Sequence, residues 1–292
     1  MSWLKEYKSS LKMPEVEELL DVWIYRPLAF LLVKLIYPTA ITPNNLTFFA
    51  IIMGAAGACF YFTGTPAGLQ MGAAFYFLFN VFDCADGQLA RLKKNGTAAG
   101  RIIDGIADYI VAVLIFSGLT LGYKGSQISN SDFIILIIIS AVSIIFQEVL
   151  VDYHRTRFLD SVLSRQNTFN EGLQVFRDEY AMLSGVRGKW FDRAIIYIYI
   201  KYSYVQSRIV ARNRFGRQIE SSPEEYFKKN SLIMRFWVLM GPTAKISTMI
   251  ICSLINRFDI YFWIVIGFFN LLAIILIVLQ LGIDRKFNTG KA

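Results

Sequence analysis

The chain has 292 residues, of which 55% are hydrophobic and 15% aromatic. Its apolar runs exceed what a soluble core needs, which excludes an ordinary soluble domain and indicates a polytopic membrane protein. The formal net charge of +8 is therefore not taken as a sign of nucleic-acid binding. In a membrane protein, the distribution of the basic residues along the chain predicts which loops are cytoplasmic.

Residues 1–42 are expected to form a juxtamembrane segment. Residues 1–13 are polar and basic and lack a cleavage-site pattern, so no signal peptide is expected. From Pro14 to about Tyr37, acidic residues are mixed with leucine, valine and aromatic residues. The first half of that stretch is too charged to span a bilayer, which predicts an amphipathic helix lying along the membrane surface.

Six apolar stretches are long enough to cross a bilayer as helices. They predict an all-α integral membrane protein, a single domain over residues 1–292 with six transmembrane helices and both termini on one side. The predicted spans are about 45–63, 67–93, 97–122, 132–155, 232–254 and 260–283.

Lysine and arginine are distributed unevenly over the connections between the predicted spans. The loops after the first, third and fifth spans hold few of them, whereas the N-terminal stretch, the turn at 91–101, residues 153–230 and the C-terminal tail hold most. By the positive-inside rule the second group is cytoplasmic. A site that opens at the 91–101 turn would therefore face the cytoplasm.

Residues 153–230 are predicted to form a cytoplasmic helical insertion between the fourth and fifth spans. Basic and aromatic residues interleave there, as in Lys189-Trp190-Phe191. The pattern is compatible with RNA binding, but no nucleic-acid fold signature is present. Basic-aromatic helices beside membrane spans more often rest on anionic lipid headgroups. Membrane lipids, and not nucleic acid, are therefore the expected partners.

Four carboxylates lie in or beside the second and third predicted spans. Burying a carboxylate in a membrane is costly, so such residues indicate a functional site. The alternative, acids on a surface loop, is disfavoured because apolar sequence flanks them on both sides. These carboxylates are Asp83, Asp86, Asp104 and Asp108.

The spacing of these residues places them on two helix faces. Asp83 and Asp86 share one face at i, i+3, and Asp104 and Asp108 share another at i, i+4. Between them, Asn95-Gly96 is expected to end the first helix with positive φ, and a threonine N-cap to begin the next. The two acidic faces can then meet.

Clustered carboxylates repel one another unless cations neutralise them. Oxygen-only ligation favours Mg²⁺ or Mn²⁺, which keep open coordination positions for phosphate. Small residues at Gly87, Ala90 and Gly100 leave room for a ligand near the backbone, and Arg91 could hold a carboxylate or meet a phosphate. The pattern predicts a metal-diphosphate site.

The stretch reads D-x2-D-G-x2-A-R-x8-G-x3-D-x3-D, and it resembles the signature of the CDP-alcohol phosphotransferases at every fixed position. The resemblance implies an enzyme of phospholipid synthesis that moves a substituted phosphate from a CDP-alcohol to an acceptor alcohol and releases CMP. A P-N-x-x-T entrance at residues 43–47 agrees with it, although that sequence is also an ordinary helix start.

The resemblance also assigns roles to individual residues. The implied ligands of Mg²⁺ or Mn²⁺ are Asp83, Asp86, Asp104 and Asp108. The implied contacts of the nucleotide and CDP-alcohol are Asn44, Thr47, Asp83, Gly87, Ala90, Arg91 and Gly100. Asp108 would act as the base that takes the proton of the acceptor hydroxyl.

Two basic residues are candidates for the acceptor pocket. Arg155, beside the single histidine His154, is either an interfacial anchor or a contact for an anionic phosphate. Lys245 lies deep in the fifth predicted span, where a lysine normally faces a polar cavity or a carboxylate.

The substrates are left open at this stage. CDP-diacylglycerol is the expected donor, and the alternative is a small CDP-alcohol of the choline or ethanolamine type with diacylglycerol as acceptor. Gly105 disfavours that branch, which often has histidine there. The resemblance also implies a homodimer, which the sequence does not test.

Two other functions would use similar acids. An aspartate-rich prenyltransferase typically has two acidic motifs far apart in sequence, whereas here all four carboxylates fall between Asp83 and Asp108. A magnesium transporter would need acids or carbonyls along a path through the bilayer, whereas here they form one cluster. Release of CMP, release of inorganic diphosphate, or ion flux would distinguish the three.

Overall fold

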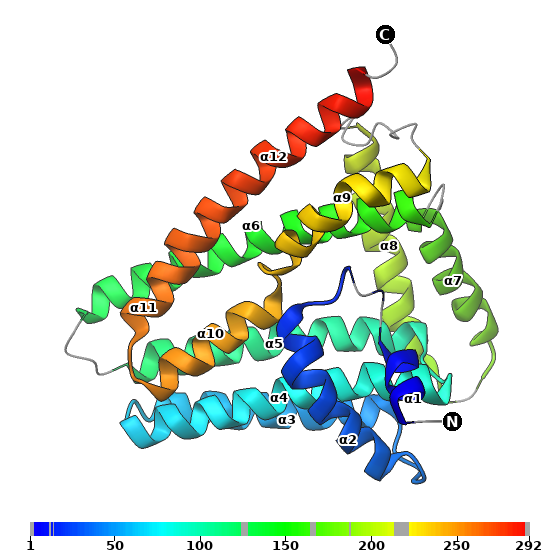
Figure 1. Ribbon diagram of the computed structural model, residues 1–292. Coiled ribbons are helices and arrows are strands. Elements are labelled where there is room, and N and C mark those ends of the chain that lie inside the picture. Colours follow the sequence, from blue (N-terminus) through cyan, green and yellow to red (C-terminus); the bar gives the residue numbers. More distant parts are fainter. Residues whose placement is uncertain are drawn as a thin grey trace.

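The computed structural model describes residues 3–11, 13, 15–123, 128–163, 168–186, 188–212 and 222–289. Every regular element within these ranges is helical, so the predicted all-α class is confirmed. Figure 1 shows two groups of long helices. The first group is α3 (Pro43–Phe62), α4 (Pro66–Lys93), α5 (Ala98–Gly122) and α10 (Pro242–Leu254). The second is α6 (Asn130–Val162), α9 (Pro223–Val238), and the run of α11 (Phe258–Phe262), the π-helical turn η2 (Trp263–Phe268) and α12 (Phe269–Thr289).

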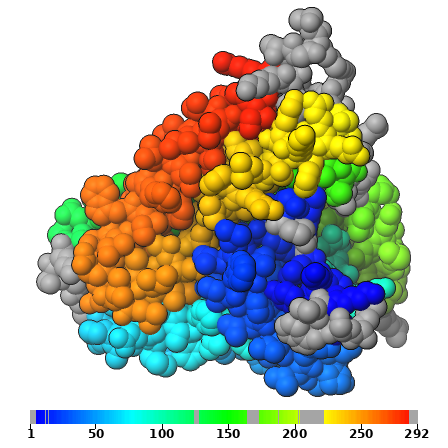
Figure 2. Space-filling view, in the orientation of Figure 1, coloured from blue at the N-terminus to red at the C-terminus, as the bar shows by residue number. Residues whose placement is uncertain are grey.

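Shorter elements cover the ends of these helices. The N-terminal segment comprises α1 (Trp3–Ser10), the π-helical turn η1 (Asp21–Tyr25) and α2 (Arg26–Ile36). In Figure 2 its blue atoms lie on the face between α4, α9 and α10. The insertion comprises α7 (Thr168–Met182) and α8 (Trp190–Arg212).

Helices α3 and α5 pack with their backbones in direct contact. A β-carbon at Gly118 of α5 would collide with the carbonyl of Ala58 on α3, and one at Gly122 would collide with the carbonyl of Tyr61. Small residues permit this close approach of helices in a membrane. The contact aligns α5 with α3, against which α4 also packs, and so determines where the acidic faces of α4 and α5 lie.

Among the described residues, five helical stretches are long and apolar enough to cross a membrane. They are Pro43–Phe62, Ala98–Gly122, Asn130–Val162, Pro223–Leu254 and Phe258–Arg285. The predicted span 67–93 corresponds to α4, whose 28 residues include the acidic pair and fall outside this group. Because α4 packs along α3 and its length would suffice, a sixth span stays a prediction.

The acidic part of the N-terminal segment is not the surface helix that was predicted for residues 14–37. Glu17 and Glu18 are only 4% and 6% exposed. Glu17 pairs with Arg26 at 2.8 Å, and a carboxylate oxygen of Glu18 accepts a hydrogen bond from the backbone N–H of Thr243 at 3.0 Å. The prediction was wrong because these acids find partners inside the protein.

The predicted fifth span, 232–254, is two helices. Helix α9 ends at Val238, and α10 begins with Pro242 at its first position after a short turn. The break is stabilised from outside, because Glu18 accepts from an N–H of the first turn of α10. The carboxylate also lies so close to Gly241 that a β-carbon there would collide with it.

The described residues of the insertion form two helices, α7 and α8, which both pack on α5. Helix α6 continues to Val162 and α9 begins at Pro223, so the insertion between the long helices is shorter than the predicted 153–230. On α8, Ile196 is fully buried, whereas Trp190 and Ile198 are 74% and 66% exposed. Contact of that exposed face with lipid stays a prediction.

Candidate active site

Helices α4 and α5 form a hairpin with a short reversal. Lys94 ends α4 in the left-handed conformation with φ of 53°, so positive φ falls there and not at Asn95-Gly96 as predicted. The predicted N-cap of α5 is confirmed, since Thr97 Oγ1 accepts a hydrogen bond from Gly100 N at 2.9 Å. The hairpin brings the two acidic faces together at its closed end.

Three carboxylates converge between α4 and α5. Asp83, Asp86 and Asp104 each offer one oxygen, and these oxygens lie within 4.8 Å of one another. Octahedral Mg²⁺ binds oxygens at about 2.0–2.1 Å, so opposite ligands stand about 4 Å apart. A small inward movement would therefore let all three oxygens bind one ion, and the all-oxygen donor set fits Mg²⁺ or Mn²⁺.

Asp108 stands outside this group of three. It is exposed on α5, one turn beyond Asp104. It lies within hydrogen-bonding reach of Asp83, the first carboxylate on α4. Asp108 is thus close to the candidate metal ligands yet accessible to a molecule that approaches from outside the hairpin.

Helix α3 contributes the residue that holds Asp86. Thr42 caps this helix in a reciprocal arrangement with Asn45, which lets α3 begin at Pro43. One turn later, the buried hydroxyl of Thr47 donates to Asp86 Oδ2 at 2.5 Å. Thr47 was predicted to contact the nucleotide, and the structure places it on a candidate metal ligand.

The predicted nucleotide contacts lie along the same hairpin and at the start of α3. Asn44 is exposed, and its Oδ1 would be 2.8 Å from a β-carbon at position 100, so the glycine there makes room for the amide. Gly87 faces the guanidinium of Arg91, one turn on along α4. Arg91 Nε donates to the carbonyl of Ser10 at the end of α1, at 2.5 Å. Ala90 is partly exposed beside them.

Sequence reasoning missed a group of polar residues next to the hairpin, here called the polar junction. The polar junction consists of Glu17, Glu18, Asp21, Arg26, Glu148, Arg155, Thr243 and Lys245. Lys245 is 4% exposed and donates to Glu148 on α6 and to the carbonyl of Met240. Arg155 Nη2 lies 3.8 Å from a carboxylate oxygen of Glu18. The two predicted acceptor residues are therefore brought into one junction, where both face carboxylates.

The junction adjoins the acidic site through Asp21. Its carboxylate accepts from the hydroxyl of Thr243 at 2.9 Å and lies 3.8 Å from the sulfur of Cys84, the neighbour of Asp83. The four acidic residues between Pro14 and Val22 were the available signal, but they were interpreted as part of a helix on the membrane surface. His154 is not part of the polar junction. Its ring stacks on the ring of Trp237, with the two centroids 4.1 Å apart.

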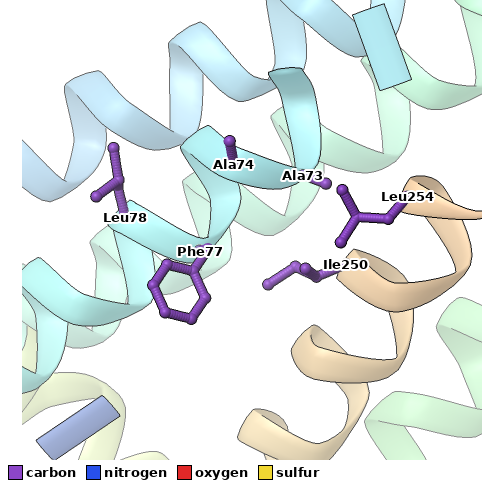
Figure 3. A pocket seen from close by; sticks show the side chains of 6 residues that line it. All are labelled: Ala73, Ala74, Phe77, Leu78, Ile250 and Leu254. Carbon is purple, nitrogen blue, oxygen red and sulfur yellow. The ribbon is translucent and has the colours of Figure 1, made fainter. Parts of the chain in front are cut away.

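An apolar groove of about 380 Å³ lies between α4 and α10. Figure 3 shows its lining, which is Ala73, Ala74, Phe77, Leu78, Ile250 and Leu254. Phe77 precedes Asp83 by six residues, which is about 9 Å along a helix. The groove therefore lies in the apolar part of the helix pair, beginning roughly two turns before the acidic site along α4.

These features define a class of protein: an all-helical membrane protein with a candidate divalent-metal site in a helical hairpin. Residues 40–174, a little under half of the chain, match the model of the CDP-alcohol phosphatidyltransferase family. The matched range begins just before α3, ends in α7 and includes all four carboxylates. The family resemblance noted in the sequence is thereby confirmed.

Two curated relatives agree with this assignment. The chain is 27% identical over 140 residues to a "Bifunctional IPC transferase and DIPP synthase" of Rubrobacter xylanophilus, in a match covering 48% of this chain and 29% of the relative. It is 32% identical over 97 residues to a "Phosphatidylinositol phosphate synthase" of Mycobacteroides abscessus, in a match covering 33% of this chain and 41% of the relative. The chain thus spans less than half the length of either relative.

Proposed function

We propose that this chain transfers a substituted phosphate from CDP-diacylglycerol to an acceptor alcohol and releases CMP. The observation that carries the proposal is the convergence of Asp83, Asp86 and Asp104 from two adjoining helices inside a family domain. The acceptor oxygen forms a bond to the phosphorus that bears the diacylglycerol. The bond from that phosphorus to the oxygen of CMP breaks, and CMP leaves with the bonding electrons.

Asp83, Asp86 and Asp104 would hold Mg²⁺ or Mn²⁺. When bound, the metal supplies positive charge to the diphosphate and to the departing CMP. Thr47 supports this by fixing one oxygen of Asp86 and leaving the other for coordination. The carboxylates are thus kept in place before substrate arrives.

Asp108 is the proposed base. Its exposure on α5 leaves it open to an acceptor hydroxyl, and its proximity to Asp83 places it beside the metal ligands. The proton of the acceptor moves to its carboxylate as the new phosphorus–oxygen bond forms. Asp108 can also serve as a metal ligand, as the family resemblance implies.

The donor nucleotide is proposed to lie along the closed end of the hairpin. Asn44, Gly87, Ala90 and Gly100 give it room, and Arg91 provides charge for a phosphate. The basic residues near this end of the helices support an opening toward the cytoplasm. A homodimer is part of the proposal through the family resemblance alone.

The apolar groove supports a lipid donor. Its lining is entirely hydrophobic, and its α4 residues end roughly two turns before Asp83, a distance that an acyl chain can span while the diphosphate meets the carboxylates. If a small CDP-alcohol were the donor, the groove would hold diacylglycerol as the acceptor instead. The acceptor is proposed to enter beside Arg155 and Lys245.

The test is to supply the purified chain, in lipid nanodiscs, with CDP-diacylglycerol, a panel of alcohols and either Mg²⁺ or Mn²⁺. We expect CMP and a new phospholipid, identified by mass spectrometry. A second arm supplies CDP-choline or CDP-ethanolamine with diacylglycerol. Release of inorganic diphosphate, or no nucleotide consumption in either arm, would contradict the proposal. An unchanged KM for the acceptor in folded Lys245→Ala would remove Lys245 from the acceptor pocket.

A further inference from the structure

The first turn of α5 is held by a residue from the insertion. Glu179 on α7 accepts hydrogen bonds from Ala98 N at 2.7 Å and from Ala99 N at 3.5 Å. The next N–H, that of Gly100, donates to the side chain of Thr97. Three of the N–H groups that a helix start leaves without helical partners are thereby satisfied, two of them by one distant carboxylate.

The carboxylate is well placed energetically. Ala98 and Ala99 are 0% and 2% exposed, so water cannot readily replace Glu179 as their acceptor. A negative charge at a helix N-terminus also interacts favourably with the helix dipole. Loss of Glu179 would therefore leave two buried donors unsatisfied at the start of α5.

Packing reinforces the same contact. The side chains of Phe176 on α7 and Ile196 on α8 are buried against Ala98 and Ala99 in a small core separate from the rest of the protein. The guanidinium of Arg101 lies over the ring of Phe176, 5.0 Å from its centroid. Both helices of the insertion thus contact the start of α5.

The held turn leads directly into the acidic site. Gly100 follows Ala99 and lies against Asn44 of α3, on the proposed nucleotide side. Asp104 is one turn further, about 9 Å along the axis from Ala98. A change in the direction of this first turn would therefore move both the nucleotide contact and a metal ligand.

We propose that Glu179 is a positioning residue for the active site, and that the insertion orients the start of α5 through it. Glu179 touches no reacting atom and acts through Gly100 and Asp104. The inference rests on the proposed function for its kinetic consequence. Its structural part, the attachment of α5, can be measured without any turnover.

The experiment compares Glu179→Ala, Glu179→Gln and the matched control Asp178→Asn in nanodiscs. Asp178 is the adjacent acid on α7, is exposed and bonds only to Gln174 among the described contacts. Hydrogen exchange at the Ala98 and Ala99 amides is measured first. Steady-state CMP release is then measured against the concentrations of CDP-diacylglycerol and Mn²⁺.

We expect Glu179→Ala to accelerate exchange at both amides and to raise the KM for donor and the half-saturating Mn²⁺ about tenfold, which corresponds to about 1.4 kcal/mol. The kcat should change much less, because no reacting group is lost. Glu179→Gln keeps an acceptor oxygen but no charge, so its amide exchange and its KM should lie between those of the parent chain and of Glu179→Ala. Asp178→Asn should match the parent chain in both.

Unchanged exchange and unchanged KM in folded Glu179→Ala would overturn the inference. Tighter donor binding in that variant would also overturn it, since Glu179 would then compete with the phosphate for the helix start. If Glu179→Ala does not fold, Glu179→Gln decides by the same two readouts. A parent chain that releases no CMP would contradict the proposed function. The inference would still stand if Glu179→Ala lowers the protection of the Ala98 and Ala99 amides or weakens Mn²⁺ binding. It fails if that variant leaves both unchanged.

Discussion

The acidic site and the polar junction contain similar residues in opposite arrangements. In the acidic site, carboxylates from α4 and α5 face one another within 4.8 Å. In the junction, carboxylates face cations: Glu17 meets Arg26, and Glu148 meets Lys245. The first arrangement raises the free energy of the folded chain until a cation binds, whereas the second supplies its own counterions.

The difference suggests how to separate function from structure in this membrane protein. Carboxylates that converge on each other indicate a site for a bound cation, and their removal should affect activity more than folding. Carboxylates paired with lysine or arginine join distant segments, and their removal should affect folding more than metal binding. The predictions below test that contrast.

The largest effect is expected for Asp104→Asn. Loss of one converging carboxylate should lower CMP release on the order of 10³-fold. Added Mn²⁺ should stabilise the parent chain against heat but not the variant, because only the parent binds it tightly. Chelation by EDTA should stop the parent reaction, and Mn²⁺ should restore it. Equal metal-dependent stabilisation of both proteins would contradict the metal assignment. Glu225→Gln, at an exposed position of α9, is the control.

Asp108→Asn should separate binding from turnover. The variant keeps the three converging carboxylates and an amide oxygen at position 108, so it should bind CDP-diacylglycerol and Mn²⁺ nearly as the parent does. Its turnover should fall about 10²- to 10⁴-fold, because the proton acceptor is lost. Binding is measured by titration calorimetry and turnover by CMP release. Near-normal turnover would refute the role of base.

Lys245→Met should change stability more than it changes metal binding at the acidic site. It leaves Glu148 without its buried counterion and should cost about 3 kcal/mol in the free energy of unfolding. The double variant Lys245→Met, Glu148→Met removes both charges and should recover most of that loss. Thermal unfolding in nanodiscs measures the cycle. A large loss of Mn²⁺ affinity in the single variant would show that the junction and the acidic site are not separate.

Thr47→Val should have a smaller effect on the acidic site itself. The variant keeps the shape of the side chain but removes the donor to Asp86, which should weaken Mn²⁺ binding about 10- to 100-fold. Thr248→Val, on α10, is the control because its hydroxyl bonds only within its own helix. Identical Mn²⁺ titrations for Thr47→Val and the parent would show that Asp86 needs no support.

The smallest expected effect is on the pH dependence of stability, which reports on Glu18 in the polar junction. Burial, reinforced by the nearby charge of Asp21, raises the pKa of Glu18 to about 8. The folded chain therefore retains a proton that the unfolded chain releases above its ordinary pKa. This stabilisation is present below about pH 4.5 and is lost as the pH rises through about 8. Glu18→Gln, which keeps an acceptor for Thr243, should show a flatter profile in thermal unfolding.

The acidic hairpin could be predicted because its signals are local. Helical periodicity places Asp83 with Asp86 and Asp104 with Asp108, and Thr97 begins the second helix as expected. The cost of a carboxylate in an apolar segment identified the cluster as functional. The position of the left-handed residue, Lys94 instead of Asn95-Gly96, was the local detail that these signals did not resolve.

The amino-acid sequence by itself determined the helical class, the acidic faces and the family signature, because each depends on residues within a few turns of one another. Only the tertiary structure decided that Glu18 stabilises the start of α10, 225 positions away, and that Glu179 holds the start of α5, 81 positions away. Helix periodicity carries no information about which distant N–H group a carboxylate will meet. That choice depends on how the helices pack, which gives these acids backbone partners on distant helices.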